Sequence, residues 1–380
     1  MSAAPQLPPP ATGTVDLLVI AGEHSGDEHA ARVVRELRAK RPATAIAAVG
    51  GPRLAAAGAQ LLFDLTASST MGFAVVRKLS FYRQFIAEVV RWIGVHRPRA
   101  VCFVDSSGLN LRIARALFDR GLSAKAGGPT RTLYYISPQV WASRAKRRFA
   151  MARHLDALAA IFPFEPEVYA DAGLPVTFVG HPFVAPDYAA PVRSDPAGPV
   201  LLLPGSRKGV VTRVFPVLVG AYQRLGGVRP AVVLYPSDEV LAVIQRTPLP
   251  PGVTCIRTGD SGQPVGAAAA LTTSGTMSMH CALAGIPGAV TYRTDPLTYA
   301  LGRLLVKVKH IGIANLLLGE SMYPEYIQGA ATPEALAAEL RACLEDPARR
   351  ERTAAQATRL RQLLAQPAEA SAADWMIHRL

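Results

Sequence analysis

Cysteine is scarce in this sequence, with four residues in 380, and the four are widely separated: Cys102, Cys255, Cys281 and Cys343. No Cys-x-x-Cys pair occurs, and a chain of this length does not need disulfides to hold a core. Apolar runs are short too, since none approaches the roughly 20 residues that cross a bilayer. The first residues lack the basic and apolar regions of a signal peptide. These absences predict a cytoplasmic protein with reduced thiols, soluble or peripherally attached to a membrane.

Patterns that bind metal are also missing. The sequence contains no Asp-x-Asp pair, and its eight histidines show no His-Glu-x-x-His or comparable ligand spacing. His24 and His29 are five positions apart, which favours turn and surface positions over a shared metal. We therefore expect neither a divalent metal nor another cofactor.

The net charge of +13 is spread along the chain. A positive field attracts nucleic acid, an anionic membrane surface or substrates that carry phosphates. Only one short basic cluster occurs, Arg144 to Arg148, and basic residues do not alternate with aromatics as they do in proteins that stack on bases. The sequence therefore argues against nucleic acid and favours a membrane or phosphorylated substrates.

Short apolar runs alternate with longer amphipathic stretches, which is typical of βα units around parallel sheets. With 380 residues and half of them apolar, the chain is long enough for two such domains. The fold class is therefore α/β with two Rossmann-like domains. The expected strands cover residues 15–20, 45–49, 100–104, 132–136, 157–162, 176–179, 200–203, 231–235, 253–256, 267–271 and 289–292.

The domain boundaries follow from composition. We expect a disordered tail over residues 1–13, which are rich in proline, and a first domain over 14–184. Residues 185–199, rich in proline and alanine, read as a linker. A second domain covers 200–345, and the Ala, Leu, Glu and Arg pattern of 346–380 predicts closing helices.

Ligands of such sheets bind beyond the carboxyl ends of the strands, so the loops that follow strands are the candidate sites. After strand 15–20, Gly22 and Gly26 allow close approach of a ligand, Glu23 lies at the sheet edge, and Asp27 belongs to the first turn of a helix. An ordinary βα turn with an acidic helix start explains this loop equally well.

Asp105 directly follows strand 100–104. A carboxylate at this position is placed to take a proton from a hydroxyl group, although capping the next helix is an equal alternative. A third loop, residues 137–144, contains Trp141, which can stack on a sugar, and it leads into the basic cluster. The arginines of that cluster either meet a phosphate or form a solvated helix face.

Two loops of the second domain carry glycine and hydroxyl groups. Gly205, Ser206 and Arg207 follow strand 200–203, and a fork-shaped guanidinium with backbone amides matches a diphosphate. Ser274, Gly275 and Thr276 lie at a second helix start. Together the two loops predict a bound nucleoside diphosphate.

With these loops, the chain resembles the lipid-A-disaccharide synthases. The matching segments are AGEHSGD (21–27), VGGPRLAAAGAQ (49–60), TMGFAVV (70–76), DSSGLN (105–110), YYISPQVWASRAKR (134–147), FPFEPEVYADAGLPVTFVGHP (162–182), LLPGSR (202–207), TTSGTMSMHCALAGIP (272–287) and ANLLLG (314–319). The resemblance implies the GT-B architecture, in which two Rossmann-like domains face a central cleft. The first domain would then bind the acceptor and the second the UDP-sugar.

The resemblance also implies the reaction. A 2,3-diacylglucosamine unit passes with inversion from UDP to 2,3-diacylglucosamine 1-phosphate, and the products are the tetraacyl disaccharide 1-phosphate and UDP. Asp105 matches the general base and Glu23 a second essential acid. The residues implied in substrate binding are Gly22, Ser25, Gly26, Asp27, Asn110, Trp141, Gly205, Ser206, Arg207, Ser274, Gly275, Thr276, His280 and Asn315.

The chain departs from the family pattern at four positions. The family commonly has carboxylates where this chain has Val75, Gly108, Val210 and His280. In such folds, an acid at the position of His280 can accept hydrogen bonds from the ribose hydroxyls. One alternative is therefore a divergent paralogue, either another UDP-sugar glycosyltransferase or an epimerase. The other is a nonenzymatic protein that binds a UDP-sugar or a lipid.

The stretch 75–93 repeats apolar residues at helical spacing and carries arginine and lysine off that stripe. It either packs on its own sheet or forms part of a rim that meets the membrane. Because the implied substrates are acylated, we expect peripheral contact with anionic lipid at the cytoplasmic face of the inner membrane. The oligomeric state is left open, with a homodimer among the alternatives.

Overall fold

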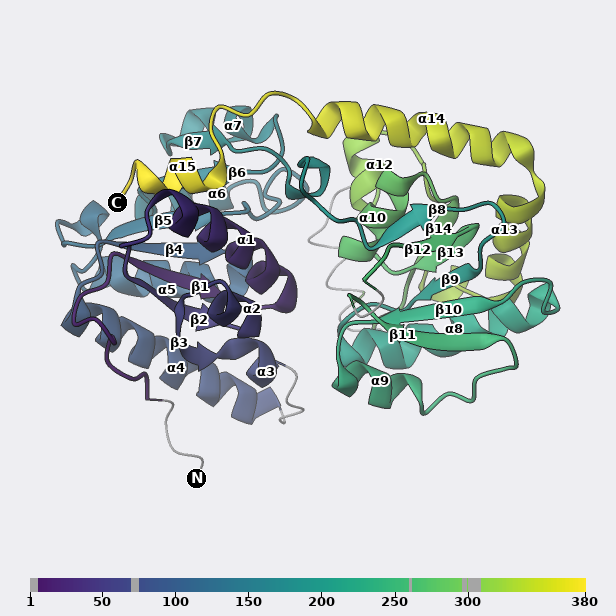
Figure 1. Cartoon of the computed structure of the whole chain (residues 1–380), viewed down its shortest axis with the longest axis horizontal. Coiled ribbons are helices and arrows are strands. Elements are labelled where there is room, and N and C mark those ends of the chain that lie inside the picture. The colour runs from purple at the N-terminus through teal and green to yellow at the C-terminus, as the bar shows by residue number, and fades with distance from the viewer. Residues whose placement is uncertain (1–5, 70–74, 260–261, 296–298, 300–308) are drawn as a thin grey trace. The chain divides into compact units, whose positions relative to one another are not determined.

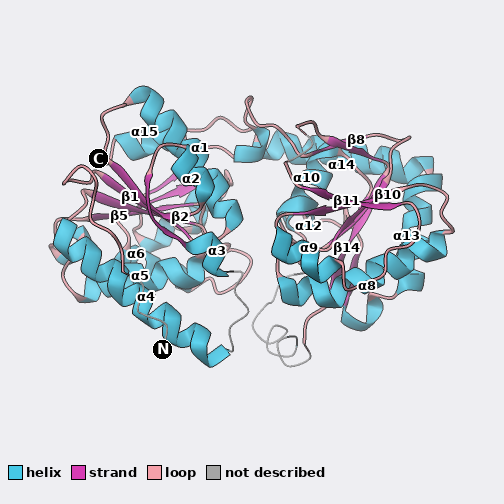
Figure 2. Cartoon of the chain, turned by 60° about the horizontal axis from the view of Figure 1, so that its bottom comes forward, coloured by secondary structure: helices cyan, strands magenta, loops and turns pink. Residues whose placement is uncertain are grey.

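A computed structural model describes residues 6–69, 75–259, 262–295, 299 and 309–380. The chain divides into two compact units (Figure 1). The first consists of Met1–Pro182 together with Gln366–Leu380, and the second of Phe183–Ala365. Each unit is a parallel sheet with helices on both faces, as Figure 2 shows.

The first unit contains a seven-stranded parallel sheet in the order β3-β2-β1-β4-β5-β6-β7. Its strands are β1 (Leu17–Ala21), β2 (Ile46–Gly50), β3 (Gln60–Asp64), β4 (Ala100–Val104), β5 (Arg131–Tyr135), β6 (Ala157–Ala160) and β7 (Val176–Phe178). Central strands β1 and β4 are apolar at every position, because helices cover both of their faces. Ala21 pairs with Val104, so these two strands end at the same level.

The helices of the first unit are α1 (His24–Lys40), α2 (Pro52–Ala56), α3 (Leu65–Ser69), α4 (Val75–His96), α5 (Ser107–Asp119), α6 (Arg147–His154), α7 (Glu165–Val168) and α15 (Ala372–Ile377). Helix α1 packs with α2 and α15, whereas α5 packs with α4 and α6. Phe85, Val89 and Trp92 of α4 are buried in one core cluster with strand residues of the sheet. In the described part of α4, the apolar stripe therefore packs on its own sheet; the side chains of 75–79 lie outside the described residues.

The second unit contains a six-stranded parallel sheet in the order β11-β10-β9-β13-β14-β15 and a two-stranded sheet of β8 and β12. Its strands are β8 (Val192–Ser194), β9 (Val200–Leu203), β10 (Ala231–Tyr235), β11 (Val253–Arg257), β12 (Val265–Ala267), β13 (Ala269–Thr272), β14 (Gly288–Tyr292) and β15 (Glu325–Ile327). Its helices are α8 (Lys208–Leu225), α9 (Asp238–Ile244), α10 (Thr276–Ala284), α12 (Ile313–Leu318), α13 (Pro333–Glu345) and α14 (Pro347–Leu364). Helices α8 and α13 pack together over the main core.

These sheets confirm the expected fold class of two Rossmann-like α/β domains. In each main sheet the strand order reverses beside the first strand, between β1 and β4 and between β9 and β13. Expected strand 267–271 is in fact two strands, because the chain passes from the two-stranded sheet to the main sheet at Ala268.

Three segments differ from the expectations. Residues 6–13 were expected to be disordered, but Leu7 is buried and the Trp92 indole donates a hydrogen bond of 2.8 Å to the Pro8 carbonyl. The expected linker contains β8, whose Val192 pairs with Val265 of β12. The closing helices do not form one group, because α14 belongs to the second unit and α15 to the first.

Candidate functional site

The candidate loops follow the strands at the two points where strand order reverses. The loops after β1 and β4 carry Glu23 and Asp105, and the loops after β9 and β13 carry Arg207 and Ser274. Neighbouring loops at such a point diverge to opposite faces of the sheet and leave room for a ligand. Each unit therefore has one candidate site.

In the first unit, Gly22 brings the loop after β1 against the loop after β4. A Cβ atom at Gly22 would lie 2.6 Å from Ser106 Oγ and 2.8 Å from Ser106 Cβ, so only glycine fits. Gly26 lies in the first turn of α1, where a Cβ would meet Val104 O at 3.5 Å and Asp105 Cβ at 3.8 Å. Gly26 therefore serves the packing of α1 on β4 and does not provide the open approach for a ligand that we expected.

Asp105 has an unusual backbone. Its φ is 49° and that of Ser106 is 41°, so two successive residues other than glycine are left-handed. The Asp105 N–H donates to Tyr135 O at 3.1 Å, and its carbonyl accepts from the Tyr134 hydroxyl and from Asn110 Nδ2, the latter at 2.9 Å. Non-glycine residues in this region cluster at functional sites and need surroundings that fix them.

Asn110 was expected to bind substrate, but its side chain is fully buried. Its amide group donates to the carbonyls of Val104 and Asp105. Asn110 therefore holds the turn that carries Asp105. Glu23 is exposed and precedes α1 at the N-cap position, and Ser25 is half-buried in the first turn of that helix.

Asp27 is buried and bonded within the protein, whereas it was expected to bind substrate. It is 1% exposed, and its carboxylate accepts backbone N–H groups from Gly51, Arg53 and Leu54 at 2.8 to 3.2 Å. These bonds close the start of α2, where a carboxylate is favourable. The position is structural, because no oxygen of Asp27 faces outward for a substrate.

Trp141 is half-buried within an aromatic group. Its ring lies edge-on to Phe164 at 5.1 Å and to Phe162 at 5.8 Å. Beside it lies Glu165, a fully buried acid that sequence analysis did not single out; its carboxylate accepts from the N–H groups of Ile161 and Phe162. Burial raises the pKa of Glu165 to about 7, while the hydrogen bonds from the backbone N–H groups of Phe162 and Ile161 lower it in part.

In the second unit, the loops after β9 and β13 touch. Gly205 has a φ of 93°, and a Cβ there would lie 2.7 Å from Thr273 Oγ1. The Thr273 N–H donates to Leu203 O at 3.0 Å. Ser206 and Arg207 are exposed, and Arg207 is the N-cap residue of α8. This turn presents a guanidinium and a hydroxyl at the start of a helix, where backbone N–H groups favour an anion.

The loop after β13 leads into α10. The Ser274 hydroxyl donates to Ile311 O at 2.7 Å, and Ser278 Oγ donates to Gly275 O at 2.6 Å. Thr276 is exposed at the first position of the helix. Apart from Gly275 and its two chain neighbours, no atom of the described residues lies within 4 Å of where a Gly275 Cβ would be. The start of α10 therefore has space in front of it.

His280, expected to face the ribose, is 4% exposed. Its ring is stacked on Tyr188 at 5.6 Å and lies 4.1 Å from the Phe183 ring, and Nε2 lies 3.2 Å from the Tyr188 hydroxyl. These rings bury the imidazole of His280. A glutamate at this position would need a polar partner for its carboxylate. At the other positions that depart from the family, Val210 packs against the core, Gly108 has open space, and the side chain of Val75 lies outside the described residues.

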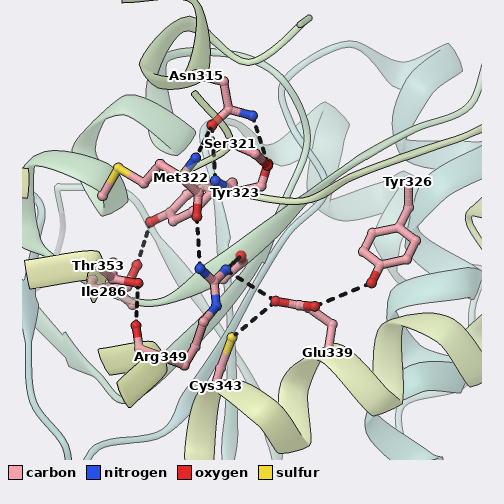
Figure 3. A network of polar contacts seen from close by, with 11 residues as sticks. Ile286, Asn315, Ser321, Met322, Tyr323, Tyr326, Glu339, Cys343, Arg349 and Thr353 are labelled. Atoms are coloured by element: carbon pink, nitrogen blue, oxygen red, sulfur yellow. Dashed lines mark hydrogen bonds and ion pairs between the residues drawn. The ribbon is translucent and has the colours of Figure 1, made fainter. Parts of the chain in front are cut away.

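Asn315 also differs from its expected role as a ligand. It is fully buried, its Oδ1 accepts from the N–H groups of Met322 and Tyr323, and its Nδ2 donates to Tyr323 O (Figure 3). Its Nδ2 also donates to Glu325 Oε1, and the four distances are 2.7 to 2.9 Å. Every polar atom of the side chain is thus used within the protein. Glu325 in turn accepts from the N–H groups of Ile311 and Gly312, next to the carbonyl that Ser274 binds.

The same network continues to Arg349 of α14, which is 5% exposed. Its guanidinium donates to Met322 O and Gly288 O at 3.0 Å and to Glu339 Oε1 at 3.1 Å (Figure 3). A buried guanidinium needs such partners, because an unpaired charge in a core is costly. The network fixes the segment that supports the Ser274 loop.

In the described part of the chain, no cluster of three or more His, Cys, Asp or Glu side chains has the geometry to hold a metal ion. None of the described helices has the length and apolar character needed to cross a membrane.

Each Rossmann-like unit has polar groups at its switch point: an acid on a left-handed turn in the first, and an exposed serine and arginine after a glycine turn in the second. The chain has the fold of the GT-B glycosyltransferases. It is similar to the calicheamicin glycosyltransferase CalG4, with a TM-score of 0.58, 15% identity and coverage of 96% of this chain and 98% of that one. It is also similar to UDP-GlcNAc 2-epimerase from Neisseria meningitidis, with a TM-score of 0.57, 11% identity and coverage of 92% and 100%. At such identities these likenesses show the fold alone.

The sequence comparisons are more specific. The lipid-A-disaccharide synthetase family model matches residues 17–378. The lipid-A-disaccharide synthase of Geobacter metallireducens is 35% identical over 367 residues, with 92% of each chain covered. That of Myxococcus xanthus is 37% identical over 344 residues, with 86% of this chain and 87% of the relative covered. The chain belongs to the lipid-A-disaccharide synthase family, and it is a UDP-sugar-dependent hexosyltransferase of lipid A biosynthesis.

Proposed function

We propose that the chain transfers 2,3-diacylglucosamine from UDP to the 6-hydroxyl of 2,3-diacylglucosamine 1-phosphate, forming the tetraacyl disaccharide 1-phosphate and UDP. The observation that carries this proposal is the acid at the switch point of the first unit. Asp105 follows β4 directly, in a left-handed turn held by Tyr134 and Asn110. The divergent-paralogue and nonenzymatic alternatives are not favoured by a family match that spans both units.

Asp105 acts as the general base in this proposal. As the acceptor oxygen attacks the anomeric carbon, its proton passes to the Asp105 carboxylate. The bond from the anomeric carbon to the UDP oxygen breaks on the opposite face, so the configuration inverts. General-base catalysis of this kind contributes about 10²- to 10⁴-fold to a rate. Glu23, exposed at the start of α1, orients the acceptor or supports Asp105.

The second unit stabilises the departing UDP. Arg207 and Ser206 supply a guanidinium and a hydroxyl, and the start of α10 at Thr276 supplies backbone N–H groups, whereas the Gly275 N–H donates to Ser278 Oγ at 3.3 Å. Preorganised donors of this kind stabilise charge that develops in the transition state, each by about 3 kcal/mol. Ser274 and Asn315 act indirectly here, because their polar atoms bind the protein itself.

We also propose that the protein meets anionic lipid at the cytoplasmic face of the inner membrane, since its substrates carry acyl chains. The formal charge of +13 supports such contact. Flotation with vesicles of anionic lipid at low salt tests it. We expect a bound fraction that falls as salt rises, and protein wholly in the unbound fraction at low salt contradicts the proposal.

The activity is tested by UDP release from UDP-2,3-diacylglucosamine and 2,3-diacylglucosamine 1-phosphate, with the product mass read alongside. Asp105→Asn should lower kcat about 10²- to 10⁴-fold and leave UDP binding near its original value, because the base acts only in the chemical step. Arg207→Ala should weaken UDP binding and turnover together. Unchanged turnover in Asp105→Asn would exclude Asp105 as the general base. Equal turnover with a donor that lacks acyl chains would indicate another sugar substrate.

A further inference from the structure

The basic cluster that sequence analysis left between two interpretations contains one arginine with an unusual position. Arg147 is the first residue of α6 and is half-buried. Its Nη1 donates to Ser107 Oγ at 3.3 Å and its Nη2 to Ser107 O at 3.2 Å. The guanidinium thus spans two acceptors of a residue 40 positions earlier. Ser107 is the first residue of α5, two positions after Asp105.

The turn that Arg147 reaches needs external support. Left-handed backbone at residues other than glycine costs about 1–3 kcal/mol per residue and persists only where the surroundings fix it. Tyr134 and Asn110 hold the carbonyl of Asp105, on the strand side of the turn. Arg147 holds the other side, where the chain enters α5. The strained pair Asp105 and Ser106 therefore lies between two sets of restraints.

The charges around the turn agree with this geometry. Burial raises the pKa of Tyr134 well above its usual value, the charge of Asp105 raises it further, and the charge of Arg147 lowers it. The Tyr134 hydroxyl that binds the Asp105 carbonyl thus lies within reach of both charges. The guanidinium belongs to the immediate surroundings of the turn.

The next residue in the cluster has a different environment. Arg148 forms an ion pair with Asp171, with an Nε to Oδ1 distance of 2.6 Å, and its guanidinium lies 4.4 Å from the exposed Phe149 ring. Its described contacts include no residue of α5. Arg148 therefore provides a matched control with the same charge, one position along the same helix.

We infer that Arg147 is a positioning residue for Asp105, which it serves by fixing the turn through Ser107. The inference rests on the proposed function, because it assumes that Asp105 is the base. A misplacement of about 1 Å at a catalytic group lowers turnover roughly a hundredfold. Loss of Arg147 should therefore lower kcat and leave UDP binding unchanged.

The experiment compares kcat, the KM of both substrates, the Kd of UDP and the melting temperature in Arg147→Ala, Arg147→Lys and Arg148→Ala. We expect Arg147→Ala to lower kcat roughly a hundredfold with KM near its original value. Arg147→Lys should recover part of this loss, since an ammonium reaches only one of the two acceptors well. Arg148→Ala should match the unchanged protein. A normal kcat in Arg147→Ala overturns the inference, and so does a rise confined to the acceptor KM, which instead indicates a direct phosphate ligand.

A double variant keeps the test decisive if Arg147→Ala folds poorly. Ser107→Ala removes one acceptor and keeps the carbonyl, so it should lower kcat by no more than Arg147→Lys does in the same assay. When it is combined with Arg147→Lys, the further loss of kcat should be small, because both substitutions act through one contact. Fully additive losses overturn the inference. An unchanged protein that releases no UDP refutes the proposed function itself, whereas an active protein with fully active variants refutes only the role of Arg147.

Discussion

Replacing Gly22 by alanine tests whether the turn at Asp105 must keep its observed position. The new Cβ would lie 2.6 Å from Ser106 Oγ and 2.8 Å from Ser106 Cβ. Carbon atoms in contact are about 3.5–4.0 Å apart, so Ser106 would have to move by about 1 Å. Ser106 directly follows Asp105 in the same left-handed turn. The shift should therefore reach the base and lower kcat roughly a hundredfold.

Gly26 is the control for this substitution. A Cβ there would meet its nearest neighbours at 3.5 to 3.8 Å, which is ordinary van der Waals contact. Because Gly26 lies in α1, alanine should add up to about 1 kcal/mol of stability through helix propensity. Gly26→Ala should therefore keep kcat within a few-fold of its original value.

The assay measures UDP release at saturating substrates, together with thermal unfolding and the Kd of UDP. We expect Gly22→Ala to lose kcat and up to about 3 kcal/mol of stability from overpacking, with UDP binding preserved. Normal turnover in Gly22→Ala would refute the reasoning. Equal losses in the two variants would refute it as well, since they would show that the loop tolerates no change of any kind.

Three further predictions concern other parts of the chain. Gly275→Ala should keep the melting temperature, since no described atom other than those of Gly275 and its chain neighbours lies within 4 Å of the new Cβ. It should raise the Kd of UDP at least tenfold by filling the space in front of α10. Unchanged UDP binding in a titration would remove that loop from the site. Because the folded pKa of Glu165, about 7, lies above its ordinary value of 4.5, its contribution to stability is complete below pH 4.5 and is lost as pH rises to 7. Glu165→Gln should therefore gain about 3 kcal/mol relative to the unchanged protein between pH 5 and 8 in urea unfolding, and a difference independent of pH would contradict the assignment. Arg349→Ala should lose about 3 kcal/mol of stability, because it leaves the half-buried Glu339 carboxylate without its guanidinium partner. Exposed Arg352→Ala should change stability by less than about 0.5 kcal/mol, and similar losses in both would argue against a stabilising role of the pair.

The sequence predicted the central strands well because they are buried on both faces. β4, β9 and β10 lie where the apolar runs predicted them. β3 and β15 were missed, since each is an edge strand of its sheet with polar residues among its few positions, such as Gln60 and Glu325. β8 was missed because its neighbours favoured a linker.

The candidate site was predictable in its loops and less so in its individual residues. A loop after a strand at a switch point follows from topology, so the positions of Glu23, Asp105, Arg207 and Thr276 in such loops and helix starts could be predicted. Residue type alone does not tell whether a polar atom already has a partner within the protein. Asp27 and Asn315 bind backbone groups, and such partners come from segments that no local pattern links to them. Arg147 was ambiguous for the same reason, because its partner lies 40 residues away.

The first unit is interrupted in the chain by the whole of the second. Its last helix, α15, packs on α1, with Trp375 1% exposed and the Ser371 hydroxyl donating to Glu36 at 2.6 Å. During synthesis, α1 is therefore made early, and α15 can cover it only after the whole second unit has been made. Nascent chains expose apolar surface for as long as such a contact is missing. Chains that stop before Gln366 should consequently be recognised by chaperones and proteases even when the second unit has folded.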